Sequence, residues 1–170
     1  MMQQLTTQAT NAKQSWAQLV RAYAAIAREL NARLSSEHDL TKNEYEVLLL
    51  LARAEEFRLR RIDIATELIL SPSGITRMLD RLGAAGLVDK AECASDRRVS
   101  YAVLTDDGMS RLKAAGRSHD AVIEELVGAR LAKTELKTLS EILERLPSVE
   151  GDAECSIEDE STRTTDSVAS

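Results

Sequence analysis

The residues best suited to chemistry in this sequence lie between Leu70 and Ser100. The first half of this segment carries Ser73, Thr76 and Arg77 at positions that fall on one side of an α-helix. Serine and threonine hydroxyls can donate to bases or phosphates, and an arginine guanidinium can bind both major-groove acceptors of a guanine. The segment therefore predicts contact with duplex DNA. The candidate DNA-binding residues are Arg60, Ser71, Ser73, Thr76, Arg77, Arg81, Asp96, Arg97 and Arg98.

The first half of this segment has the signals of a short amphipathic helix. Ser71 is a favourable N-cap, and Pro72 suits the first helical position because an N–H there would have no intrahelical partner. Gly83 and Gly86 are expected to end the helix, since a residue without a Cβ can turn the chain. Apolar residues spaced three and four apart predict its buried face. They are Ile75, Met78, Leu79 and Leu82.

A second short helix is predicted directly upstream, over Arg60–Leu68. Two helices joined as closely as these form a helix-turn-helix, whose second helix enters the major groove. Ile69 stands in the connection, where glycine is common, and its branched side chain restricts the backbone there. The residues expected to face inward are Ile62, Ala65 and Leu68.

A β-hairpin is predicted downstream. Val99–Thr105 is rich in β-branched and aromatic residues, as a strand should be. Pairing with Leu87–Glu92 leaves Cys93–Arg98 as the hairpin tip. Arg97 and Arg98 there can reach phosphate and a narrow minor groove, which attracts arginine. A recognition helix followed by a basic hairpin predicts a winged helix-turn-helix.

The stretches LSPSGITRMLDRLGAAGLV and SDRRVSYAVLTDDG resemble the core of the MarR family of bacterial transcriptional regulators. The resemblance covers roughly residues 16–146. It implies an obligate dimer that represses genes from a palindromic operator and is released by phenolic or drug-like ligands, or by oxidation. It also makes Arg98 the wing arginine of the minor groove, with Asp96 as its orienting partner. The residues that it places at the major groove are Ser73, Thr76 and Arg77.

The outer segments predict long amphipathic helices that bury their apolar stripes best against a second copy of the chain. Intramolecular packing in a monomeric bundle is the alternative. The apolar positions are Leu19, Tyr23, Ile26, Leu30 and Leu34 before the core, and Leu136, Leu139, Ile142, Leu143 and Leu146 after it. The predicted organisation is a polar N-terminal arm at 1–14, an N-terminal dimerisation helix at 15–40, a winged helix-turn-helix DNA-binding domain at 41–105, C-terminal dimerisation helices at 106–147 and a disordered acidic tail at 148–170.

Composition supports a mainly α-helical protein with a small β-hairpin wing. The chain has 170 residues and 44% hydrophobic residues, which suits one globular domain with an adequate core. Aromatic residues make up only 3%, which argues against binding single strands by base stacking. The start of the chain is polar rather than apolar, and no apolar run approaches the length of a transmembrane helix. We therefore expect a cytoplasmic protein.

The excess of acidic over basic side chains lies at the C-terminus. The chain has 22 basic and 28 acidic side chains, and residues 148–170 hold one of the former and seven of the latter. Residues 1–147 are thus balanced at 21 of each. Within residues 58–98 there are eight basic and six acidic side chains, so attraction to phosphate is local.

A small-molecule effector site is expected between the dimerisation helices and the DNA-binding domain, by analogy with the family. A ligand there would change the spacing of the two recognition helices, which must match successive major grooves about 34 Å apart. The candidate contacts to an acidic aromatic ligand are Tyr23, Arg28, His38 and Tyr45.

Other function classes have weaker support. A winged-helix module that binds an acidic protein is one alternative, and a redox-responsive regulator is another, since Arg97 and Arg98 would favour the thiolate of Cys93. The family's peroxide sensors carry their reactive cysteine near the N-terminal helix, where this chain has none. Cys93 and Cys155 are too far apart in sequence for a metal motif, and no cofactor is expected. No catalytic motif supports an enzyme.

Overall fold

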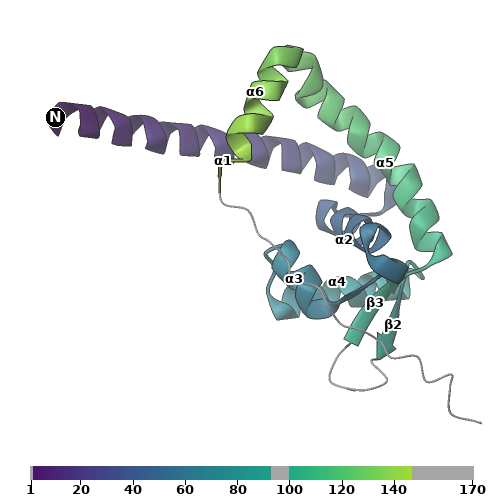
Figure 1. Cartoon of the computed structure of the whole chain (residues 1–170). Coiled ribbons are helices and arrows are strands. Elements are labelled where there is room, and N and C mark those ends of the chain that lie inside the picture. The colour runs from purple at the N-terminus through teal and green to yellow at the C-terminus, as the bar shows by residue number, and fades with distance from the viewer. Residues whose placement is uncertain (1, 93–99, 147–170) are drawn as a thin grey trace, which may run out of the picture.

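The computed structural model describes residues 2–92 and 100–146 and contains, within them, six α-helices and one three-stranded antiparallel sheet. Figure 1 shows α1, α5 and α6 on one side of the molecule, α3, α4 and the strands on the other, and α2 between them. The elements in chain order are α1 (Met2–His38), α2 (Lys42–Arg53), the 3₁₀ turn η1 (Glu55–Phe57), β1 (Arg58–Arg60), α3 (Arg61–Glu67), α4 (Pro72–Ala84), β2 (Val88–Glu92), β3 (Ser100–Leu104), α5 (Asp106–Leu126), the 3₁₀ turn η2 (Gly128–Arg130) and α6 (Lys133–Leu143).

Helix α1 is longer than the sequence pattern indicated. It begins at Met2, so residues 2–14, expected as a polar arm, form its first turns. This part of the chain contains neither glycine nor proline, so nothing in it stops a helix. Its N-terminal half projects away from the other elements (Figure 1).

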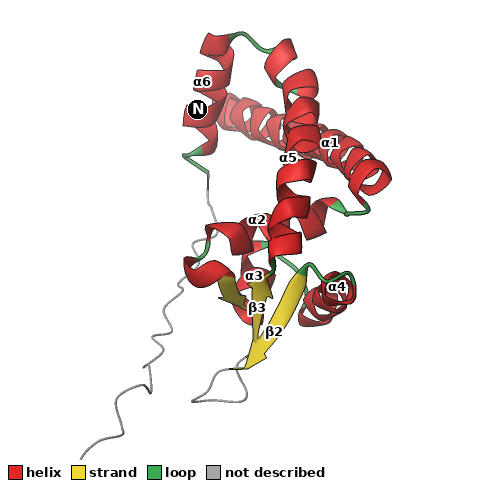
Figure 2. Ribbon diagram, turned by 90° about the vertical axis from the view of Figure 1, so that its right-hand side faces the viewer, coloured by secondary structure: helices red, strands yellow, loops and turns green. Residues whose placement is uncertain are grey.

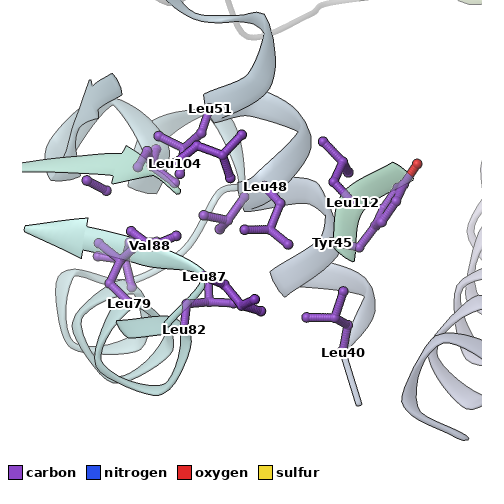
Figure 3. Close-up of a cluster of buried hydrophobic side chains, with 14 of the residues drawn as sticks. Leu40, Tyr45, Leu48, Leu51, Leu79, Leu82, Leu87, Val88, Leu104 and Leu112 are labelled. Atoms are coloured by element: carbon purple, nitrogen blue, oxygen red, sulfur yellow. The ribbon is translucent and has the colours of Figure 1, made fainter. Parts of the chain in front are cut away.

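Helix α2 is the centre of the core. It starts with a capping box, in which Thr41 and Glu44 each hydrogen-bond the other's backbone N–H. Its side chains Val47, Leu48 and Leu51 are fully buried, and they meet apolar residues from both sides of the molecule (Figure 3). Among these neighbours are Leu34 of α1, Ile64 of α3, Leu82 of α4, Leu104 of β3 and Leu112 of α5.

The sheet consists of the predicted hairpin and one additional strand. β2 pairs with β3 from Val88↔Leu104 to Glu92↔Ser100, which confirms the predicted pairing. β1 pairs with the other edge of β3, so the strand order is β1-β3-β2 (Figure 2). β1 was missed because three residues are too few to show an alternating pattern.

The helix-turn-helix is formed by α3 and α4. Helix α4 has the predicted Ser71 N-cap and Pro72 start, and it continues through Gly83 to end one residue later. The prediction that Ile62 of α3 faces inward was wrong. Its side chain is 61% exposed, and Ile64 is buried in its place. Ala65 is buried and Leu68 packs against the core as predicted, so packing of α3 against α4 and the sheet changes the buried face only by replacing Ile62 with Ile64.

The two helices end in the same hydrogen-bonded motif but with different residues in the left-handed position. After α4, Gly86 has φ +71°, and Leu87 N–H bonds Leu82 O. After α3, Ile69 has φ +52°, and Leu70 N–H bonds Ala65 O. Glycine adopts this conformation freely, whereas a β-branched residue does so at a cost of about 1–2 kcal/mol.

Replacing Ile69 by glycine should therefore stabilise the protein. The side chain is 80% exposed, so its removal loses little burial. We expect the free energy of unfolding to rise by roughly 0.5–1.5 kcal/mol, because the relieved strain exceeds the backbone entropy of glycine in the unfolded chain. Urea unfolding followed by circular dichroism measures the change. Ile69→Ala is the matched control, since it removes the branch and keeps the Cβ; an equal gain from alanine would contradict this account.

Candidate nucleic-acid interface

The open face of α4 presents polar side chains to solvent. Ser73, Arg77 and Asp80 are exposed, while Ile75 and Leu79 on the opposite face are buried. Within the described residues, the Arg77 guanidinium has no hydrogen bond or ion pair, so all its donors are available. A free guanidinium in the middle of this face is suited to base edges in the major groove.

The first turn of α4 uses the hydroxyl of Ser71 for its own structure. Ser71 Oγ accepts a hydrogen bond from the Gly74 N–H at 3.2 Å and lies 3.3 Å from Ser73 Oγ. The two hydroxyls are exposed side by side at the N-terminus of the helix. This end of α4 can therefore donate hydroxyl groups to a phosphate while its N-cap stays intact.

Thr76 joins α4 to α3. Its hydroxyl donates to the carbonyl of Pro72 at 2.8 Å and accepts from the guanidinium of Arg61. Thr76 was predicted to contact bases, and Arg61 was not among the predicted DNA contacts. Arg61 lines a groove of about 370 Å³ with Arg60, Pro72 and Ser100. Its place directly after another arginine, at the start of α3, was the signal that could have identified it.

Arg60, the last residue of β1, is held by a side chain of α3. Its Nε and Nη2 bond the two carboxylate oxygens of Asp63 at 2.7 and 2.9 Å. Both side chains are partly buried. A paired guanidinium of this kind contributes less to DNA attraction than a free one, because its charge is balanced locally.

An ion pair connects α4 to the hairpin. Lys90 of β2 lies 2.6 Å from the carboxylate of Asp80, and both side chains are exposed. The pair balances the negative charge that Asp80 brings to the open face. Lys90 was not among the predicted contacts, because its proximity to α4 depends on how β2 packs against that helix and not on the spacing of residues in the sequence.

Arg81 differs from Arg77 although it lies one turn further along the same helix. Its Nε is 3.1 Å from Oε1 of Glu44, and its Nη2 donates to the carbonyl of Asp39 at 3.3 Å. The predicted DNA contact at Arg81 thus involves a side chain that already bonds the α1–α2 junction. The predicted wing contacts Asp96, Arg97 and Arg98, the candidate redox residue Cys93 and the acidic tail at 148–170 lie outside the described residues.

The four candidate effector contacts fall into two places. Tyr23 is exposed on α1 with the ammonium of Lys42 5.9 Å from its ring centre. Arg28 lines a groove of about 670 Å³ between α1, the start of α2 and α4. Like Arg77, Arg28 makes no side-chain hydrogen bond or ion pair within the described residues. The other lining residues are Ala27, Asn31, Thr41, Lys42, Asn43, Glu44, Gly74, Arg77, Met78 and Arg81.

His38 and Tyr45 lie at the contact with α5. His38 Nε2 is 2.8 Å from Ser118 Oγ, and the Tyr45 ring stacks on His119 with their centres 4.8 Å apart. Burial raises the pKa of Tyr45, with the Asp120 carboxylate acting in the same direction, so its hydroxyl is neutral at physiological pH. These side chains join α1, α2 and α5 rather than line the groove beside Arg28.

The described part of the chain contains no group of three or more side chains able to hold a metal ion. In the same residues, no helix is both long and apolar enough to cross a membrane.

Comparison with known proteins gives consistent matches. The model of the MarR family matches residues 40–100. The HTH-type transcriptional regulator MhqR of Bacillus subtilis (strain 168) is 30% identical over 128 residues, which cover 75% of this chain and 86% of the relative.

Solved structures give the same picture. The MarR family regulator Sco3205 from Streptomyces coelicolor, in complex with DNA, matches with a TM-score of 0.72 and 26% identity, covering 78% of this chain and 82% of that one. CouR from Rhodococcus jostii RHA1, bound to p-coumaroyl-CoA, matches with a TM-score of 0.65 and 25% identity, covering 74% and 86%.

Proposed function

Since the chain belongs to the MarR family of DNA-binding transcriptional regulators, we propose that it is a homodimeric repressor that binds a palindromic operator and is released by a small phenolic or drug-like molecule. Proteins of this family regulate transcription and are not enzymes. The observation that carries the proposal is the guanidinium of Arg77, which lies on the exposed face of the recognition helix and has no partner within the described residues.

Base reading is assigned to Ser73 and Arg77 in this proposal. Thr76 contributes indirectly, by positioning Arg61, since its hydroxyl is bonded to that guanidinium and to the helix backbone. Ser71 and the wing arginines Arg97 and Arg98 are proposed to bind the DNA backbone and the minor groove.

A homodimer is supported by the apolar faces that α1 and α6 leave uncovered. No residue of α6 is buried within the chain. The exposed apolar side chains are Trp16, Leu19, Val20 and Tyr23 near α1's midpoint, and Leu139, Ile142, Leu143 and Leu146 at the C-terminal end of the described chain. An amphipathic helix with no buried residue needs a partner for its apolar face. A symmetric dimer built on α1 and α6 would carry two copies of α4, one for each half-site of a palindromic operator.

The effector is proposed to bind in the groove beside Arg28. Arg28 and Arg77, whose guanidinium groups have no partner in the described part of the chain, can bind a carboxylate, and Ala27 and Met78 offer apolar surface to a ring. A ligand that engages Arg77 withdraws it from DNA. Binding and DNA contact are then mutually exclusive for that side chain, which gives the differential affinity that release requires.

Arg77→Gln should relax sequence preference. Binding to a duplex that the wild-type protein selects from a random-sequence pool should weaken by roughly 1–3 kcal/mol, while binding to a scrambled duplex changes little. Fluorescence anisotropy at fixed salt measures both constants. Arg130→Gln removes the same charge from exposed η2 and is the control. Full retention of affinity by Arg77→Gln would contradict the proposed base contact.

Leu143→Glu should convert the dimer to a folded monomer. The side chain is 41% exposed within the chain, so the substitution leaves the protomer's core intact and places a charge in the proposed interface. Light scattering after size exclusion at micromolar concentration measures the mass. Lys137→Glu on the opposite side of α6 makes a larger charge change and should stay dimeric. A dimeric Leu143→Glu protein would place the interface elsewhere.

Release by an aromatic acid should depend on Arg28. We expect salicylate or 4-hydroxybenzoate at millimolar concentration to lower the affinity of the wild-type protein for its selected duplex, and Arg28→Ala to abolish this effect because the carboxylate loses its guanidinium partner. Arg21→Ala removes the same charge from α1 two turns earlier and should respond like wild type. An Arg28→Ala protein that is still released would exclude this groove as the site for these acids.

A further inference from the structure

Arg81 connects the recognition helix to the junction between α1 and α2. Its Nε lies 3.1 Å from Oε1 of Glu44. Its Nη2 donates to the backbone carbonyl of Asp39 at 3.3 Å and lies 3.5 Å from the Asp39 carboxylate. One side chain of α4 thus bonds both the turn that follows α1 and the first turn of α2.

Glu44 is a fixed anchor for this contact. Its side chain is only 4% exposed, and Oε2 accepts the backbone N–H of Thr41 at 2.7 Å and the Thr41 hydroxyl at 2.8 Å. The carboxylate cannot move without opening the capping box that starts α2. A buried carboxylate also needs partners for both oxygens, and Arg81 supplies the charged partner of Oε1.

The turn between α1 and α2, which Arg81 bonds, is itself constrained. Asp39 has φ +52°, and the N–H of Lys42 bonds the side-chain oxygen of Asn31 at 3.1 Å. The end of α1, the turn and the start of α2 are therefore linked to one another before Arg81 adds α4. Through these contacts, the direction of α4 is tied to that of α1.

We propose that Arg81 is a positioning residue for DNA recognition: its contact with Glu44 fixes the orientation of α4 relative to α1, and it does not itself bind DNA. The inference rests on the proposed function, because it presumes that α4 reads sequence. The contrast with Arg77 supports it, since the guanidinium one turn earlier has no partner among the described residues while that of Arg81 faces the junction.

The two roles predict opposite effects for Glu44→Gln. If Arg81 bound a phosphate, removing the negative charge beside it would strengthen DNA binding, because the guanidinium would no longer be shared. If Arg81 positions α4, the same substitution weakens the contact that holds the helix, and binding to a specific duplex falls. The sign of the change separates the two.

The experiment uses the full chain and two duplexes of equal length, one selected by the wild-type protein from a random pool and one scrambled. Binding is measured at several salt concentrations for Arg81→Gln, Glu44→Gln and the double variant, after circular dichroism has shown each to be folded at the assay temperature. We expect each single variant to lose about tenfold in affinity for the selected duplex, with the scrambled duplex and the salt slope unchanged. The double variant should be no weaker than either single one, because both remove the same contact.

Arg130→Gln is the matched control. Arg77→Gln removes an arginine from the same helix that does not bond Glu44, but it acts on the base contact that a misoriented α4 also weakens, so only Arg130→Gln, which lies on η2 away from α4, should add its effect to that of Glu44→Gln. If the control adds its effect to that of Glu44→Gln while Arg81→Gln does not, the loss of affinity comes from the ion pair and not from a general loss of positive charge.

Three results would overturn the proposal. One is a salt slope lowered by about 0.9 in Arg81→Gln with equal losses on both duplexes, which marks a phosphate contact. The others are tighter binding by Glu44→Gln and unchanged binding by Arg81→Gln. Selection of a duplex by the wild-type protein tests the proposed function before any variant is made, so the two failures are distinguishable.

Discussion

Burial of α2 is the constraint on which the arrangement of both sides of the molecule depends. Its fully buried side chains, among them Leu48 and Leu51, belong to one hydrophobic cluster with residues of α1, α3, α4, α5 and the sheet. Each such side chain is stabilised by about 1.5–3 kcal/mol relative to exposure, and no other element has neighbours on as many sides. A shift of α2 would therefore require the outer helices and the recognition helix to move with it. Apolar packing sets how far apart these parts lie, and polar contacts at the end of α2 set their relative direction.

Local signals in the sequence mark several helix starts, although the start of α1 was predicted at residue 15 and lies at Met2. The Ser71 cap of α4, the capping box of Thr41 and Glu44, and the Thr105 cap of α5 all involve residues within three positions of one another. Such contacts are determined by the chain itself, so residue type and spacing suffice to identify them. The hairpin of β2 and β3 was predictable for the same reason, because its strands are close in sequence and rich in β-formers.

Features that depend on distant parts of the chain could not be read in this way. Ile62 has the spacing of a buried residue, yet packing of α3 buries Ile64 and leaves Ile62 in the groove. Arg81 looks like another exposed cation of the recognition helix, yet its partner Glu44 lies in a different helix. Arg61 was overlooked because its contact with Thr76 depends on how α3 crosses α4. The sequence thus indicates which surface binds DNA more reliably than which side chains on it are free to do so.

The length of α1 has a mechanical consequence for the proposed dimer. With 37 residues, it is about 55 Å long. The middle of this helix lies about 30 Å from its C-terminal end, so a tilt of about 4° there moves that end by about 2 Å, more than half the rise of one base pair, about 3.4 Å. The exposed apolar residues Trp16 and Leu19 lie near the middle of this rod, and the junction that bonds α4 lies at its end. Small rotations where the two protomers meet would thus move each recognition helix by an appreciable fraction of the base-pair repeat, so the long helix acts as a lever that amplifies changes at the dimer interface.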